Sequence, residues 1–178
     1  MPVSYMEINL NALRHNLRVI RQHLPKEVNV LAGVKANAYG HGAVETLRIA
    51  MEEGYTAAAV ARVEEGAKLR EAGFTCPIYV LGLPLPEDML MGVKYDLTLP
   101  VDDTVDLDAF EDIAKGAGKT VEVMMPIDTG MNRIGTHPED VKPFLKKLAG
   151  YPHLHLHGTW THMATADCKD KSAALKQL

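Results

Sequence analysis

The chain has 178 residues, of which 47% are hydrophobic and 24% are charged, a balance that is typical of a folded globular protein and excludes a disordered one. The formal net charge of −4 provides no basic surface, so we expect neither nucleic acid nor an anionic membrane as a partner. No apolar run approaches the ~20 residues that span a bilayer, and the N-terminus lacks a basic segment followed by an apolar core, which predicts a cytoplasmic protein without a signal peptide.

The first elements along the chain are predicted from the spacing of apolar residues. Residues 5–8 could form a short strand. Apolar side chains then recur at steps of three and four, which predicts a helix that Asn9 or Asn11 caps and Pro25 closes. The side chains of this stripe are Leu10, Leu13, Leu17, Ile20 and Leu24. The next apolar run predicts a buried strand that ends at Lys35.

Beyond Lys35, strands and helices are predicted to alternate. We expect strands at residues 56–61, 77–83, 97–101, 120–127 and 154–161. We expect helices at residues 43–53, 63–72, 86–94, 103–115, 138–149 and 169–178. Several of the strands are continuous apolar runs, which is typical of a parallel sheet that is covered on both faces.

This alternation predicts an α/β fold. The spacing of the strands matches the βα units of a closed (β/α)8 barrel of TIM type, which has about 250 residues. Since about six of the eight units are present, we expect an incomplete barrel in one domain, residues 1–178, whose end falls inside a helix. A doubly wound open sheet is the alternative, but no Gly-x-Gly-x-x-Gly turn follows the first strand, which disfavours its nucleotide-binding form.

The strand that ends at Lys35 carries the first candidate for chemistry. An amine in a partly dry pocket is a better nucleophile toward carbonyl groups, because its charged form is disfavoured there. The turn that follows contributes backbone N–H groups and a phenol, which suit a phosphate. The alternative is a surface lysine whose stem covers apolar residues.

Two further candidates follow later strands. Arg133 lies in a loop between Gly130 and Gly135, where a guanidinium can bind a carboxylate through two hydrogen bonds; the alternative is a surface arginine in a flexible turn. His162 ends the last predicted strand. Together with Lys35, both residues fall at the carboxyl ends of predicted strands, which is the rim where parallel barrels build their active sites.

Three segments of the chain resemble motifs of bacterial alanine racemases. They read Val-Lys-Ala-Asn-Ala-Tyr-Gly-His-Gly at 34–42, Ile-Asp-Thr-Gly-Met-Asn-Arg-Ile-Gly at 127–135 and Gly-Thr-Trp-Thr-His-Met-Ala-Thr-Ala-Asp at 158–167. They occur in the order found in that family. The resemblance implies a fold-type III enzyme that uses pyridoxal 5′-phosphate (PLP), of which residues 1–178 would be the N-terminal PLP-binding barrel portion, without the C-terminal β domain.

The resemblance also implies roles for four residues of this sequence. Lys35 matches the lysine that carries PLP as a Schiff base and removes the α-proton of the D-amino acid. Tyr39 matches the tyrosine that hydrogen-bonds the cofactor phosphate. Arg133 matches the arginine that contacts the substrate carboxylate and the phenolic oxygen of the cofactor, and His162 matches the histidine against the pyridine ring.

By this resemblance the protein is expected to be an isomerase that interconverts L-alanine and D-alanine and supplies D-alanine for peptidoglycan. The full-length parent is expected to be a homodimer, whose opposite-face base is a tyrosine in the C-terminal domain of the partner subunit. Because that domain lies outside these residues, we expect the 178-residue chain alone to be inactive and to hold PLP weakly. The alternatives are a serine-preferring racemase, a non-catalytic PLP-binding barrel of the cofactor-homeostasis type, and a fragment without a ligand.

Some positions lie outside this assignment. Many members of the family that the chain resembles have a lysine, often carbamylated, where this chain has Pro126, so Arg133 must be positioned in another way or by an anion. The alternating imidazoles of His153, His155 and His157 are interpreted as a solvated strand face, and no metal is expected, since no Cys/Asp cluster supports a site. Asn37 and Asp128 are predicted either to support the site residues from behind or to shape loops, and Met124, Met125 and Trp160 to lie in the core. Cys76 and Cys168 lack metal spacing and are expected to be free thiols.

Overall fold

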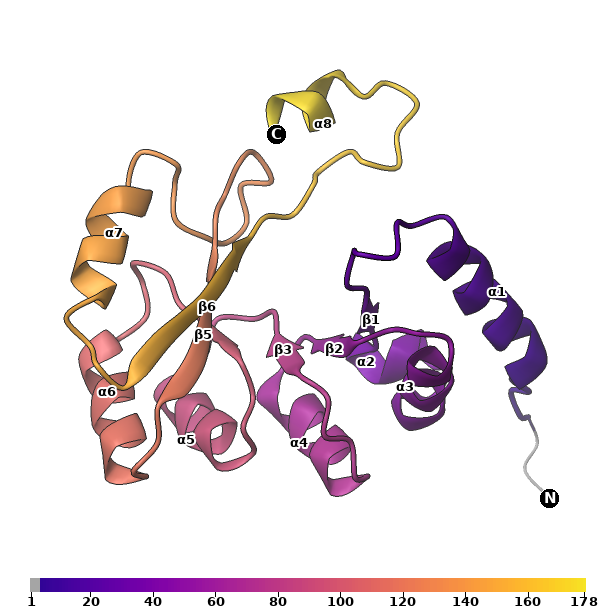
Figure 1. Ribbon diagram of the computed structural model, residues 1–178, viewed down its shortest axis with the longest axis horizontal. Helices are drawn as coiled ribbons and strands as arrows, with labels where there is room; N and C mark the ends of the chain where they lie inside the picture. The colour runs from indigo at the N-terminus through magenta and orange to yellow at the C-terminus, as the bar shows by residue number, and fades with distance from the viewer. Residues whose placement is uncertain (1–3) are drawn as a thin grey trace. The chain divides into compact units, whose positions relative to one another are not determined.

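The computed structural model describes residues 4–178. Its contacts divide the chain into two compact units, one that extends to Tyr79 and one from Val80 to Leu178. Both units alternate strands with helices (Figure 1). The assignment of all residues to one domain stays a prediction.

The first unit is built on short parallel strands. It contains helices α1 (Leu10–Gln22), α2 (Lys35–Tyr39), α3 (Ala43–Glu52) and α4 (Val63–Glu71), strands β1 (Leu31–Gly33) and β2 (Ala57–Val60), and most of β3 (Ile78–Val80). The sheet has the order β1-β2-β3, and β1 runs parallel to β2 with Leu31 opposite Ala57 and Gly33 opposite Ala59. All four residues of β2 are buried, as expected for a strand covered on both faces.

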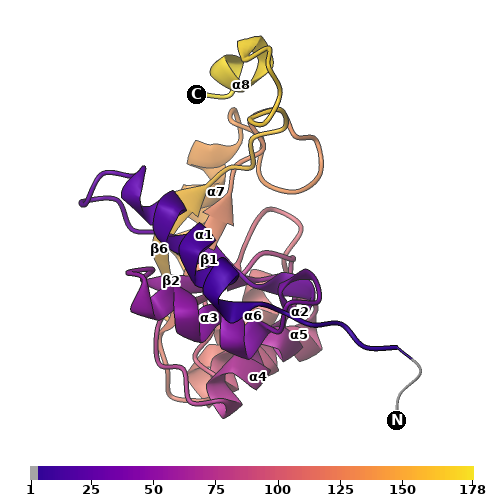
Figure 2. The same ribbon diagram turned by 90° about the vertical axis from the view of Figure 1, so that its right-hand side faces the viewer.

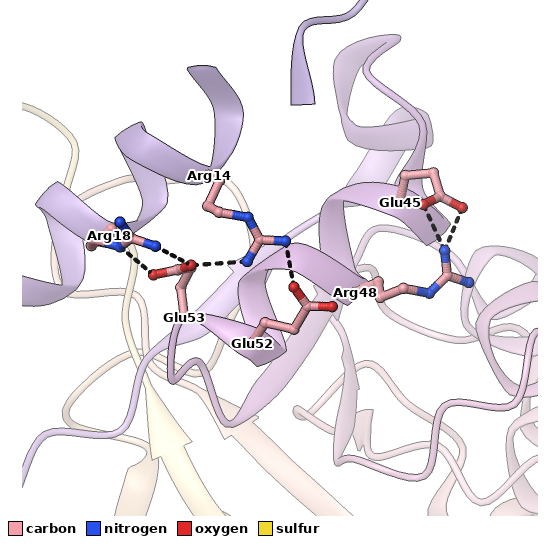
Figure 3. A network of polar contacts seen from close by, with 6 residues as sticks. All are labelled: Arg14, Arg18, Glu45, Arg48, Glu52 and Glu53. Atoms are coloured by element: carbon pink, nitrogen blue, oxygen red, sulfur yellow. Dashed lines mark hydrogen bonds and ion pairs between the residues drawn. The ribbon is translucent and has the colours of Figure 1, made fainter. Parts of the chain in front are cut away.

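Four charged side chains join α1 to the end of α3 (Figure 3). Arg14 Nη1 lies 2.9 Å from Glu53 Oε1, and Arg18 Nε lies 2.8 Å from Glu53 Oε2. Arg14 also pairs with Glu52. No residue of α1 is buried, whereas the side chain of Glu53 is only 9% exposed. These ion pairs therefore help to attach α1, a helix without buried residues, to the end of α3.

We predict that acid weakens this attachment. Hydrogen bonds from Arg18 and then Arg14 lower the pKa of Glu53 from its ordinary 4.5 to about 2. Since the folded-state pKa is the lower one, the pairs stabilise the fold fully above the ordinary pKa and lose this effect as the pH falls toward about 2. In urea titrations across this window, the free energy of unfolding of Glu53→Gln should fall less steeply with pH than that of the wild type.

Glu45→Gln is the matched control for this prediction. Glu45 pairs with Arg48 at 2.5 Å within α3 (Figure 3), and both side chains are about half exposed. Such an exposed pair within one helix contributes little, so this variant should follow the pH dependence of the wild type. A Glu53→Gln variant with the same pH dependence as the wild type would show that the pairs with α1 do not contribute.

The second unit contains the longer strands. Its elements are α5 (Pro86–Lys94), β4 (Leu99–Pro100), α6 (Leu107–Gly116), β5 (Val121–Pro126), α7 (Val141–Leu148), β6 (Leu154–Trp160) and α8 (Ser172–Lys176). The sheet is parallel in the order β4-β5-β6, with Val121 opposite Leu154 and Pro126 opposite Trp160. Both views show α8 beyond the carboxyl ends of β5 and β6 (Figures 1 and 2), so the loops after these strands lie on one side of this unit.

The early elements match the prediction with two corrections. Residues 5–8 form no strand, so this expectation is wrong. Asn9, rather than Asn11, caps α1, because its Oδ1 accepts the N–H groups of Asn11 and Ala12 at 3.0 Å. The segment α2 after β1 is short, and its residues 36–39 have left-handed backbone angles. Residues 36–39 therefore form a left-handed turn rather than a right-handed helix.

The later helices begin further along the chain than expected. Helix α6 begins at Leu107 because Asp106 caps it, its Oδ1 accepting the N–H of Ala109 at 3.0 Å. Helix α7 begins at Val141, after a turn in which Asp140 N–H donates to His137 O at 2.9 Å. Helix α8 is limited to five residues. Within residues 4–178, no helix has both the length and the apolar character needed to cross a membrane.

Candidate functional site

Lys35 lies two residues after the carboxyl end of β1, with Val34 between them, and its side chain is half-buried. The next four residues, 36–39, all have φ between 51° and 55°. A left-handed turn of residues with a Cβ costs about 1–2 kcal/mol per residue. Strain of this kind persists only where the surroundings impose it, and it concentrates at functional sites. The backbone around Lys35 is thus held in a conformation that its own residues disfavour.

The turn is held by hydrogen bonds from within and from outside. Ala38 N–H donates to Val34 O at 2.8 Å. Asn37 accepts on both its oxygens, with Gly42 N–H on its carbonyl at 3.0 Å and Ala43 N–H on Oδ1 at 2.9 Å. The second bond caps α3, so the prediction that Asn37 shapes the loop is confirmed.

The turn brings an amine and a phenol together. Lys35 Nζ lies 5.9 Å from the centre of the Tyr39 ring, and the Tyr39 side chain is largely exposed. Two of the four predicted site residues therefore share one short segment of the first unit. Both polar ends are available to a ligand that carries a carbonyl group and an anionic group.

The loop after β5 is organised by the buried carboxylate of Asp128. Its Oδ1 accepts the N–H groups of Asn132 at 2.9 Å and Gly130 at 3.0 Å. These hydrogen bonds lower the pKa of Asp128 below its ordinary value, and the bond from Asn132 has the largest effect. The loop closes where Thr136 N–H donates to Pro126 O and Asp128 N–H donates to Thr136 O, both at 3.0 Å. The predicted loop-shaping role of Asp128 is confirmed.

Arg133 and His162 meet in the second unit. They line one small hollow together with residues of the β5 and β6 ends, among them Ile127 and Trp160. Arg133 is exposed and also lines an adjoining open hollow of about 410 Å³. Among the residues that the structure describes, its guanidinium has no ion-pair partner, so it is available to an anion.

The profile of the family described as "Alanine racemase, N-terminal domain" matches residues 8–178. The chain belongs to this family. Its three motifs fall within the matched range, and the α/β fold of parallel barrel type that was expected from them is confirmed. The convergence of Lys35 and Tyr39 with Arg133 and His162 on one rim stays a prediction.

Proteins of the alanine racemase family resemble the chain over almost all its length. The alanine racemase of Methanococcus maripaludis is 39% identical over 174 residues, which are 97% of this chain and 47% of that protein. An alanine racemase structure from Clostridium difficile 630 is 38% identical with a TM-score of 0.90, covering 96% of this chain and 45% of the other. The chain thus spans about half the length of the relatives that it matches.

One related structure has a different name. The histidine racemase of Leuconostoc mesenteroides is 31% identical, with a TM-score of 0.86, over 96% of this chain and 46% of that protein. The fold of this N-terminal domain therefore occurs in racemases that are named for two different amino acids. The fold alone does not specify the side chain of the substrate.

Gln177 is a buried residue of this alanine racemase family domain whose role was not predicted from the sequence. Its Nε2 donates to His162 O at 3.0 Å and to Thr129 Oγ1 at 3.1 Å, and its Oε1 accepts Ala164 N–H at 2.9 Å. The amide links the Asp128 loop to the segment after β6. The sequence around Gln177 gave no signal of this role, since Lys176 precedes it and the helical pattern of this segment is mixed.

The remaining expectations have mixed outcomes. Met125 is fully buried, as expected, but Met124 and Trp160 are only half-buried. His155 and His157 are exposed and pair with Glu122 at 2.9 and 3.3 Å, which confirms the solvated strand face for these two. His153 instead is half-buried and pairs with Glu111 at 2.5 Å. Cys76 and Cys168 are free thiols.

Proposed function

We propose that this chain is the cofactor-binding part of a PLP-dependent amino-acid racemase in which Lys35 holds PLP. The observation that carries the proposal is the half-buried amine at the end of β1, with the Tyr39 phenol on the same strained turn. The membership of the chain in the alanine racemase family supports it.

The residues present fit this cofactor chemically. PLP has an aldehyde, which reacts with an amine, and a phosphate, which accepts hydrogen bonds. Lys35 provides the amine, and the hydroxyl group of Tyr39 provides a hydrogen-bond donor. The imidazole of His162 suits the face of an aromatic ring. The guanidinium of Arg133 suits a carboxylate or a phenolate oxygen, and its lack of an ion-pair partner among the described residues favours this use. Pro126 lines the same small hollow and carries no charge, and the Asp128 carboxylate, which also lines it, accepts backbone N–H groups of its own loop.

Bound PLP would supply the electron sink that makes the Cα–H of an amino acid acidic. The residues of the chain would then do the rest. Arg133 would fix the substrate by its carboxylate, and Lys35 Nζ would take and return the α-proton on one face. Racemisation also needs an acid/base group on the opposite face, for which the resemblance names a tyrosine of a partner subunit.

Alanine is the proposed substrate, because the relatives that the chain matches include proteins named alanine racemase. Histidine is the second candidate, since the Leuconostoc protein is named for it. For the full-length protein we propose a cytoplasmic homodimer that supplies D-alanine for peptidoglycan. Exchange of the α-hydrogen with deuterium in the full-length protein, measured for alanine, serine and histidine, should be fastest for alanine. A faster exchange for serine or histidine would reassign the substrate.

The cofactor assignment is tested by chemical fixation. The protein is incubated with PLP, reduced with borohydride and mapped by peptide mass spectrometry. We expect a phosphopyridoxyl group on Lys35 alone, because its amine and the Tyr39 phenol follow the carboxyl end of a parallel strand, whereas Lys94, which lies beside Tyr95, ends a helix before its strand. Label spread over surface lysines, or no label, would overturn the proposal.

A further inference from the structure

Glu65 is the residue outside the four predicted site positions that reaches the turn of Lys35. Its Oε1 accepts the N–H of Ala36, the residue after Lys35, at 2.7 Å. Its Oε2 accepts the N–H groups of Ala61 at 2.8 Å and Arg62 at 3.2 Å. One half-buried carboxylate therefore joins the carboxyl end of β1 to that of β2.

Helix capping explains only half of this arrangement. Glu65 is the third residue of α4, and a glutamate at that position commonly accepts the N–H of the N-cap residue, here Arg62. The contact with Ala36 spans 29 residues of sequence and contributes nothing to the cap. Its partner is the first residue of the left-handed turn, where the chain needs an external restraint.

We infer that Glu65 is a positioning residue for Lys35. By holding Ala36 N–H, it fixes the direction in which the chain leaves β1, and with it the point from which the Lys35 amine extends. A charged acceptor forms a shorter and stronger hydrogen bond than a neutral one. The inference rests on the proposed role of Lys35 and adds to it a residue that does not itself touch the cofactor.

Glu65→Gln tests the inference with a nearly unchanged side-chain shape. The two carboxylate oxygens accept on opposite sides, whereas an amide offers one oxygen and one N–H₂ donor. We expect the amide oxygen to stay on the two N–H groups of the cap, those of Ala61 and Arg62, which leaves the N–H₂ group toward Ala36 N–H, where it cannot accept a hydrogen bond. Glu65→Asp is the second variant: it keeps the charge at the start of α4, but it is one methylene shorter and should not reach Ala36.

Glu64→Gln is the matched control. Glu64 is the preceding residue of the same helix turn, is exposed, and contacts the Arg62 side chain at 3.4 Å, a weak surface pair. Its loss removes the same charge from α4 without touching the turn of Lys35.

The first readout is amide hydrogen exchange in the protein without added PLP. We expect exchange at Ala36 and in residues 37–40 to be roughly tenfold faster in Glu65→Gln and Glu65→Asp than in the wild type, the loss expected for one charge-assisted hydrogen bond. Exchange in β2, and that of the Glu64→Gln variant, should stay as in the wild type. Equal exchange at Ala36 in all four proteins would overturn the inference.

The second readout is the rate and selectivity of borohydride-fixed labelling by PLP. In Glu65→Gln and Glu65→Asp we expect roughly tenfold slower labelling of Lys35 and unchanged labelling of surface lysines. Labelling of Lys35 at the wild-type rate in both variants would overturn the inference and leave the proposed function intact. A wild type without label on Lys35 would overturn the proposed function, and with it this inference.

Discussion

The variant Lys35→Ala is expected to lose the borohydride-fixed PLP adduct completely. The reason is chemical: no other group on the turn of residues 36–39 can form an imine with the aldehyde. Lys35→Arg should lose the adduct as well, since a guanidinium stays protonated and is a poor nucleophile, while it keeps the positive charge. The measurement is peptide mapping after reduction, with the absorption of the cofactor followed in parallel.

Lys68→Ala serves as the control, because Lys68 is an exposed lysine of α4 in the same unit. The Lys68→Ala variant should lose only the weak labelling of a surface lysine and should keep the adduct on Lys35. Circular dichroism and the urea midpoint of Lys35→Ala should match those of the wild type, since the side chain is not part of the core. An adduct that persists in Lys35→Ala would show that another lysine holds the cofactor.

The variant Gly135→Ala is expected to destabilise the second unit strongly. Gly135 has φ +112°, and a Cβ there would lie 2.9 Å from Pro126 O and 3.0 Å from Asp128 N. The backbone conformation costs about 1–2 kcal/mol for alanine, and the steric overlap with main-chain atoms adds about 1–3 kcal/mol. The free energy of unfolding in urea should therefore fall by roughly 2–5 kcal/mol.

Gly73→Ala separates the two contributions. Gly73 also has positive φ, +90°, but nothing lies within 4 Å of a Cβ built there. It should lose only the conformational part, about 1–2 kcal/mol. Equal losses at both positions would mean that the loop around Asp128 moves to admit the methyl group.

The consequence for the site follows from the same loop. A Cβ at Gly135 would approach the backbones of Pro126 and Asp128, which take part in the hydrogen bonds that close the loop. Arg133 lies two positions before Gly135. A loop displaced by the methyl group would move the guanidinium away from His162, with which it shares a hollow. Because we propose that Arg133 binds the substrate carboxylate, we expect a higher KM of the full-length protein for alanine in Gly135→Ala even where the protein remains folded.

The amino-acid sequence was sufficient to predict the class of the fold, and it supplied the chemical groups proposed for the site. Apolar stripes and runs indicated the helices and parallel strands, because burial repeats with the period of each element. The motifs around Lys35, Arg133 and His162 indicated the family, since they are contiguous in sequence. Element boundaries were less well determined, as at α6, where the cap at Asp106 decides the start.

The tertiary structure alone decided how these groups are held. Glu65 meets Ala36 across 29 residues, and Gln177 meets Thr129 across 48 residues. Neither contact is indicated by the apolar periodicity, because each joins a polar side chain to a group that lies far away in the sequence. The left-handed turn at residues 36–39 was equally invisible in the sequence, since two alanines and a tyrosine disfavour it and only the asparagine tolerates it well. Only the surrounding hydrogen bonds, made by the folded chain, impose that conformation.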